Sequence, residues 1–148
     1  SESQLDFDID VAKKQSMDNP VFYVQYAHAR GCSMARKAEE SGMTGPYADA
    51  NLPLLTLPEE LQLMKLLALY PEMVRNAALT CEPHRVTAYL QELAASFHGY
   101  FTRYTLREER GISDDHDLSR ARLAMVAAVR QVVANGLDLL GVAAPERM

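Results

Sequence analysis

Apolar side chains recur every three to four residues along most of the chain, the spacing that places them on one face of an α-helix. After Pro83 this pattern runs through Val86, Leu90, Leu93 and Phe97 to Tyr100 or Phe101 and Tyr104. From about Asp117 to Leu140 it runs through Leu118, Ala121, Met125, Ala128, Val129 and Val132. Almost no stretch shows the two-residue alternation of a strand. The pattern predicts an all-α fold, a single bundle of four to five helices.

Turn and capping residues predict where the first helices begin and end. Asn19 is a natural N-cap with Pro20 at the first helical position, and the helix should run to about Glu40, where Ser41-Gly42 ends it. The stretch 42–56 holds Gly45, Pro46 and Pro53, which is typical of a loop. Before the first helix, the alternation Leu5-Asp6-Phe7-Asp8-Ile9-Asp10 indicates a short extended segment. A calcium loop is disfavoured there, because Val11 stands where an EF-hand needs glycine.

The remaining helices are predicted in the same way. Thr56-Leu57-Pro58-Glu59 reads as a capping box whose helix ends before Pro71. Pro71 then starts a short helix to about Thr80, and Pro83 starts a long one. The charged stretch 107–115 is expected to be a surface loop. In the last helix Asn135-Gly136 could introduce a bend, and Gly141 is a natural C-cap.

Length and charge narrow the function classes. The chain has 148 residues, a single domain's worth, with a net charge of −5 and a pI near 5.3. Such acidity argues against a non-specific nucleic-acid coat but leaves recognition by a local patch open, and 11 of the 15 basic residues are arginine. No run is apolar enough for a membrane span. The two cysteines match no metal or redox spacing and read as reduced thiols.

The predicted first helix carries an unusual stripe. At about 100° per residue, one side of this helix holds the face expected to pack on the bundle, which comprises Val24, His28, Gly31 and Ala35. Far from that face, within an arc of roughly 60° that is expected to point away from the core, lie Tyr23, Tyr26, Arg30 and Lys37. Aromatics interleaved with cations suit exposed bases and phosphates. Tyrosines on a helix also commonly pack against a neighbouring helix, and spacing alone leaves both interpretations open.

No catalytic or metal constellation stands out. Asp114-Asp115-His116-Asp117 lies where a loop enters a helix and is better explained as acidic N-terminal capping than as a metal site. His28 is expected to be a hydrogen-bonded core histidine, and neither His84 nor His98 has a partner spacing that suggests catalysis. By pattern alone Tyr100 and Tyr104 are core aromatics. The chain has no credible active site and is expected to catalyse nothing by itself.

Several strings resemble one family, the C-terminal part of bacterial arginyl-tRNA synthetase. The resemblance covers almost the whole chain, and its first and last blocks are highly specific. These blocks are 5–10 with Asp18-Asn19-Pro20-Val21-Phe22-Tyr23-Val24-Gln25-Tyr26-Ala27-His28-Ala29-Arg30, Glu82-Pro83-His84-Arg85, Ala94-Ala95-Ser96-Phe97-His98, Asn135-Gly136-Leu137-Asp138-Leu139-Leu140-Gly141, and Ala144-Pro145-Glu146-Arg147-Met148. The resemblance implies the α-helical anticodon-binding domain of a class I synthetase, often called the DALR domain.

The resemblance also implies a partner and a site. The parent enzyme would charge arginine tRNA in the cytoplasm using ATP and Mg²⁺, with no DNA or membrane partner and no cofactor in this chain. The motifs that hold ATP, and the Asp-Ala-Leu-Arg string itself, would lie upstream of Ser1, so a fragment joined to its own catalytic domain is expected. The family implies that the anticodon pocket is lined by Tyr23, Tyr26, Arg30, Tyr100, Tyr104 and Met148. Met148 should fold back beside Tyr23 and Tyr100.

Two functions of different class follow. One is a tRNA-binding module of a ligase. The other is a helical interaction module that docks another protein through its tyrosine stripe. Phosphate contacts weaken with salt, whereas an apolar protein interface changes little, so salt dependence separates the two.

Overall fold

A computed structural model describes residues 8–105 and 115–148 of the chain. Within these ranges it contains helices and no strand, so the predicted all-α bundle is confirmed. The elements are α1 (Ile9–Lys13), α2 (Pro20–Glu40), the short 3-10 helix η1 (Leu52–Leu54), α3 (Pro58–Thr80), α4 (His84–Thr105) and α5 (His116–Leu139). None of the described helices is long and apolar enough to cross a membrane.

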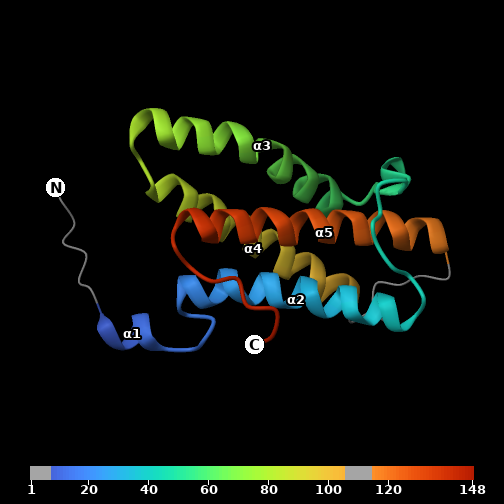
Figure 1. Cartoon of the computed structure of the whole chain (residues 1–148), viewed down its shortest axis with the longest axis horizontal. Helices are drawn as coiled ribbons and strands as arrows, with labels where there is room; N and C mark the ends of the chain where they lie inside the picture. The colour runs from blue at the N-terminus through green and yellow to red at the C-terminus, as the bar shows by residue number, and fades with distance from the viewer. Residues whose placement is uncertain (1–7, 106–114) are drawn as a thin grey trace.

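Helices α4 and α5 lie between α2 and α3 (Figure 1). Helix α2 packs against α5 and α4, while α3 packs against α4 and α5. The side chains that meet in the middle are almost fully buried and come from all four long helices, as Ala27, Leu63, Leu90, Phe97, Val126 and Val129 show. Burial of these apolar side chains is the main stabilising term of the bundle.

Two glycines allow the helices to approach closely. A Cβ at Gly31 would lie 2.5 Å from Cγ of Arg130, and a Cβ at Gly136 would lie 2.6 Å from Cδ2 of Leu90. Both distances are shorter than van der Waals contact, so only glycine fits without a shift of the neighbouring side chain. Gly136 therefore brings α5 close to α4, and α5 continues through it to Leu139.

The predicted ends of α2 are confirmed. The Asn19 side chain accepts a hydrogen bond from the Val21 amide at 3.0 Å, and Pro20 is the first helical residue. Gly42 follows the helix with a φ of +81°. The acidic cap of α5 is confirmed for Asp115, whose carboxylate accepts from the amides of Asp117 and Leu118, whereas Asp114 and most of the predicted 107–115 loop lie outside the described residues.

Three expectations about local structure are wrong. Pro71 lies inside α3, which is one helix, because an exposed position tolerates the loss of a single backbone hydrogen bond. The α3 cap lies one residue later than predicted, since Glu60 rather than Glu59 accepts from a backbone amide, that of Leu57, at 3.1 Å. Ile9 begins a helix rather than an extended segment, as the Asp8 carboxylate caps the Asp10 amide; residues 5–7 lie outside the described part.

After α5 the chain turns sharply and runs back across α2 (Figure 1). Gly141 has a φ of +71°, and the Val142 amide reaches back to the Leu137 carbonyl at 2.9 Å, which closes the helix as the glycine predicted. Side chains of α2 then hold the tail by its carbonyls: Gln25 donates to Ala143 at 2.8 Å, His28 to Pro145 at 2.9 Å, and Arg36 to Glu146 at 3.3 Å.

Candidate functional site

The tyrosine stripe of α2 lies against α4, which differs from the expectation that it points away from the bundle. Tyr23, Tyr26 and Arg30 are half-buried, and only Lys37 is exposed. The Tyr23 ring centroid lies 4.6 Å from that of His98 on α4. Helix α2 contacts two helices, α5 through the predicted apolar face and α4 through the edge of the stripe, and a single-helix projection does not reveal the second contact.

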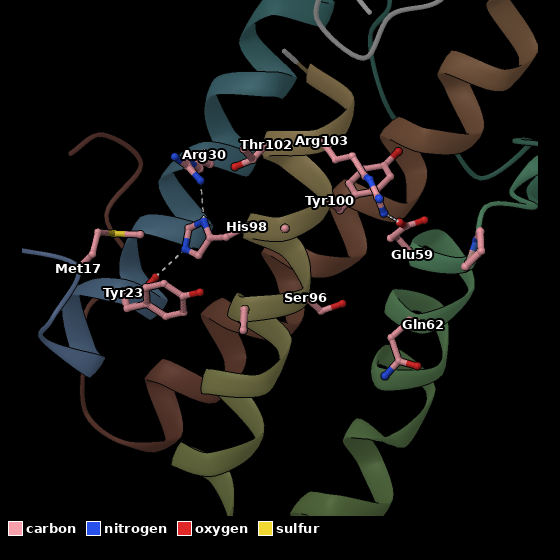
Figure 2. A pocket seen from close by; sticks show the side chains of 13 residues that line it. Met17, Tyr23, Arg30, Glu59, Gln62, Ser96, His98, Tyr100, Thr102 and Arg103 are labelled. Atoms are coloured by element: carbon pink, nitrogen blue, oxygen red, sulfur yellow. Dashed lines mark hydrogen bonds and ion pairs between the residues drawn. The ribbon is translucent and has the colours of Figure 1, made fainter. Parts of the chain in front are cut away.

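His98 stands at the centre of this contact, and the sequence pattern did not single it out. Its Nδ1 accepts a hydrogen bond from the Arg30 guanidinium at 2.9 Å, and its Nε2 bonds to the Tyr23 carbonyl at 3.0 Å (Figure 2). Burial lowers the pKa of His98, and the Arg30 charge lowers it further, against the opposing effect of the bond to the Tyr23 carbonyl. His98 therefore favours its neutral form.

Arg30 is also held by aromatic rings. Its guanidinium carbon lies 4.6 Å from the centroid of the Tyr26 ring and 4.7 Å from that of Phe101. These are cation–π distances. The two rings and the hydrogen bond to His98 hold the Arg30 side chain in place, so it loses less rotamer freedom when a ligand binds.

A cleft of about 930 Å³ opens between α2, α4 and α3 on one side of this contact (Figure 2). An ion pair between Arg103 and Glu59, which both line the cleft, links α4 to α3. The residues around it are Met17, Tyr23, Arg30, Pro58, Glu59, Gln62, Ala95, Ser96, His98, Gly99, Tyr100, Thr102 and Arg103.

A smaller cavity of about 400 Å³ lies between α2, α4 and the C-terminal tail, and Arg30 lines it as well. It combines two aromatic rings with three arginines in a chain whose net charge is −5. This is the local basic patch that the composition left open. Its lining residues are Tyr26, Ala29, Arg30, Ser33, Arg36, Phe101, Arg147 and Met148.

Met148 folds back onto the bundle, but not beside the predicted neighbours. It lines the smaller cavity with Tyr26 and Phe101, whereas Tyr23 and Tyr100 line the larger cleft. The reason is the tail's anchoring on α2 by Gln25, His28 and Arg36, described above, which carries it along the Tyr26 side of that helix. His28 is buried and hydrogen-bonded, as predicted.

Tyr100, one of the two α4 tyrosines of the predicted site, does not form an exposed wall. Tyr100 is only 2% exposed, and its hydroxyl donates to Oε1 of Glu60 at 3.1 Å. The same carboxylate oxygen accepts from Nε of Arg122 at 2.9 Å. Tyr100 is thus a core residue that reaches the cleft by its edge, which agrees with the pattern-based interpretation. The Tyr104 side chain lies outside the described part.

The arrangement is suited to binding rather than to chemistry. Aromatic rings, a fixed guanidinium and further arginines can stack on a planar ligand, donate to its edges and neutralise its anionic groups. Within residues 8–105 and 115–148, no cluster of three or more His, Cys, Asp or Glu side chains could hold a metal ion.

The chain is similar in sequence and in structure to arginine–tRNA ligases. The chain is 57% identical over 149 residues to the arginine–tRNA ligase of Syntrophotalea carbinolica, with 100% of this chain and 26% of that protein covered. It is 53% identical to that of Desulfosudis oleivorans, covering 99% and 26%. The Thermus thermophilus arginyl-tRNA synthetase structure matches with a TM-score of 0.78 and 36% identity, over 99% of this chain and 24% of that one.

This chain spans about a quarter of the length of these relatives. The profile of the DALR anticodon binding domain matches residues 24–148, which include most of α2, all of α3 to α5 and the tail that closes the smaller cavity. The chain belongs to the DALR anticodon-binding domain family.

Proposed function

We propose that this chain is the part of an arginyl-tRNA synthetase that binds the anticodon loop of arginine tRNA. The observation that carries the proposal is the smaller cavity, where Tyr26, Phe101 and Met148 meet three arginines. Single-stranded loops are recognised by stacking unpaired bases on aromatic rings and by donating hydrogen bonds to their edges. The similarity to arginine–tRNA ligases supports the identity of the RNA.

The cavity provides separate groups for a base and for its phosphates. Tyr26, Phe101 and the thioether of Met148 form the apolar part, suited to an unstacked base. Arg30 supplies fixed N–H donors, while Arg36 and Arg147 also line the cavity and are the cations that we assign to the phosphates. An acidic protein can thereby bind RNA through a local charge of the right sign.

The larger cleft borders the opposite side of Arg30 and is the place we assign to a second nucleotide of the same loop. Tyr23 presents a half-buried ring there. Tyr100 contributes only its edge, so its role in our proposal is to support the wall. Tyr104 remains part of the proposed site on the resemblance alone.

The remaining steps of the reaction are assigned to other parts of the parent enzyme. ATP and Mg²⁺ would bind in a catalytic domain that this chain does not include, in a cytoplasmic enzyme. The 148-residue chain alone should therefore show no arginine-dependent ATP–pyrophosphate exchange. Exchange by the pure chain would contradict this division of labour.

The direct test is binding of an anticodon stem-loop RNA to this chain, by fluorescence anisotropy at two salt concentrations. With two or three phosphates contacted, affinity should fall about tenfold between 50 and 200 mM salt. The control RNA has the same stem and an exchanged anticodon, and it should bind more weakly at both concentrations.

Two results would contradict the proposal. Equal affinity for both RNAs would show non-specific binding, and no RNA binding by folded protein would favour the alternative of a helical module that docks a protein through its tyrosine stripe. Affinity for such a partner would change little with salt.

A further inference from the structure

Both ring nitrogens of His98, a residue of α4, form hydrogen bonds to residues of α2. It is 6% exposed, and its ring lies 4.6 Å from the Tyr23 centroid and 5.7 Å from that of Tyr26. One nitrogen bonds to Arg30 and the other to the Tyr23 carbonyl.

The identity of the two partners fixes the protonation state of the ring. A guanidinium can only donate and a carbonyl can only accept, so Nδ1 must be the unprotonated acceptor and Nε2 must carry the hydrogen. His98 is therefore the neutral Nε2–H tautomer. A second proton would place an N–H of the ring against an N–H of Arg30 and break that hydrogen bond.

The orientation of Arg30 depends on this bond. The rings of Tyr26 and Phe101 lie 4.6 and 4.7 Å from the guanidinium carbon, which leaves the N–H edges rather than the faces for a ligand. One N–H group of the guanidinium donates to His98 and is therefore not available to a ligand. The remaining N–H groups are left for a ligand in the two cavities that Arg30 lines.

We propose that His98 is a positioning residue for RNA recognition: it accepts a hydrogen bond from Arg30 and thereby fixes the guanidinium so that its remaining N–H groups meet acceptor atoms on the edge of an unstacked base. This inference rests on the proposed function and deepens it. A consequence is that acid weakens recognition, because protonation of His98 releases and repels Arg30.

The surroundings of His98 agree with this direction. From α2 the ring faces the charge of Arg30 and the phenols of Tyr23 and Tyr26. Across the cleft α3 contributes Glu59, which is already paired with Arg103 of α4. Burial and the Arg30 charge both lower the pKa of His98, so the neutral form that holds Arg30 is the form at pH 7.

Two substitutions of His98 each keep one of its two hydrogen bonds and remove the other. In His98→Asn the amide oxygen can take the place of Nδ1, so the acceptor for Arg30 is kept and the bond to Tyr23 is lost. In His98→Gln the longer amide reaches the place of Nε2, so the bond to Tyr23 is kept and the acceptor for Arg30 is lost. Neither the Asn nor the Gln side chain titrates between pH 5 and 8.

The experiment measures the affinity of the arginine anticodon stem-loop RNA for the whole chain at fixed salt. We expect His98→Gln to weaken binding roughly tenfold at pH 7.5, as loss of a well-placed edge contact would. His98→Asn should recover most of that loss. From pH 7.5 to 5.5 the wild type should lose affinity relative to His98→Asn on the same RNA.

A double-mutant cycle tests whether His98 acts through Arg30. In an Arg30→Ala background, His98→Gln should cost no further affinity, since there is no guanidinium to orient. Equal losses for the Asn and Gln variants, or a full Gln effect without Arg30, would overturn the inference. If the wild-type chain binds no RNA, the proposed function itself has failed.

A measurement without substitution keeps the inference testable if a variant does not fold. The nitrogen chemical shifts of the His98 imidazole in wild-type protein report its tautomer. We expect the Nε2–H form at pH 7.5 and loss of the Arg30 hydrogen bond on acidification. A proton on Nδ1 at pH 7.5 would overturn the inference.

Discussion

Two polar clusters lie on different sides of α4, and they differ mainly in how far they are sealed from solvent. The sealed cluster, Glu60, Tyr100 and Arg122, joins α3, α4 and α5 and is at most 7% exposed. The open cluster, Tyr23, Arg30 and His98, joins α2 and α4 and borders both cavities. Similar donors and acceptors thus serve different purposes.

The comparison shows that burial determines which arginine a ligand can contact. Arg122 gives its Nε hydrogen to Glu60 in a site with almost no exposure, so its bonding holds the helices together. Arg30 is only half-buried and lines both cavities, so N–H groups remain at a surface that a ligand can reach.

The largest effect should come from breaking the sealed cluster. Glu60→Ala leaves the Arg122 charge buried without its carboxylate, so the free energy of unfolding should fall by about 3–5 kcal/mol. Denaturant unfolding measures it. Glu59→Ala is the matched control, because its ion pair with Arg103 is at the surface and should contribute no more than about 1 kcal/mol. Equal losses at both positions would show that the two sites do not differ.

The second-largest effect is expected beside the open cluster. Tyr26→Ala removes a ring beside Arg30 and should reduce RNA affinity by about 1–3 kcal/mol, the range for base–aromatic stacking. Tyr100→Phe keeps its ring and loses the bond to Glu60, so it should lower stability and leave RNA affinity near the wild-type value. RNA titration and thermal unfolding of both variants separate these effects, and the reverse assignment would contradict the account.

A smaller effect is expected at the tail. Deleting Met148 should weaken RNA binding by about 1 kcal/mol, since part of one apolar side chain no longer covers the base. Thermal unfolding should change little, because Met148 is 49% exposed. The exposed Leu79, on α3 away from both cavities, gives the control Leu79→Ala. Unchanged RNA affinity on deleting Met148 would mark the terminus as dispensable.

The smallest effect is a pH dependence of stability. The pKa of His98 is lowered in the folded chain, so the unfolded chain binds more protons in acid. The stabilisation from neutral His98 is complete above the unfolded pKa of about 6.5 and is lost as pH falls through the lowered value. Unfolding at pH 7.5 and 5.5 should show a larger drop for wild type than for His98→Asn. Equal drops would exclude His98 as the source.

Local signals predicted the fold better than the site. Asn19, Pro20 and Gly42 fixed the ends of α2 because caps act over a few residues. Pro71 led to the wrong prediction of a helix end. The free-energy cost of a proline inside a helix depends on whether its position is exposed, which the sequence does not show. The helical pattern predicted the burial of Tyr100, but not its hydrogen bond to Glu60, which is 40 residues away in the sequence. His98 gave no signal, because its two partners lie on another helix.

The most direct test of the central claim locates the RNA on the folded chain. Methyl-labelled methionines report different places: Met148 lines the smaller cavity and Met17 the larger cleft. Met73 lies in a separate groove between α3 and α4, and Met43 is buried with Ala38 and Leu123. On titration with the arginine anticodon stem-loop RNA, the methyl signals of Met148 and Met17 should shift while those of Met73 and Met43 stay in place. A shift of Met73 with Met148 unmoved would contradict the account.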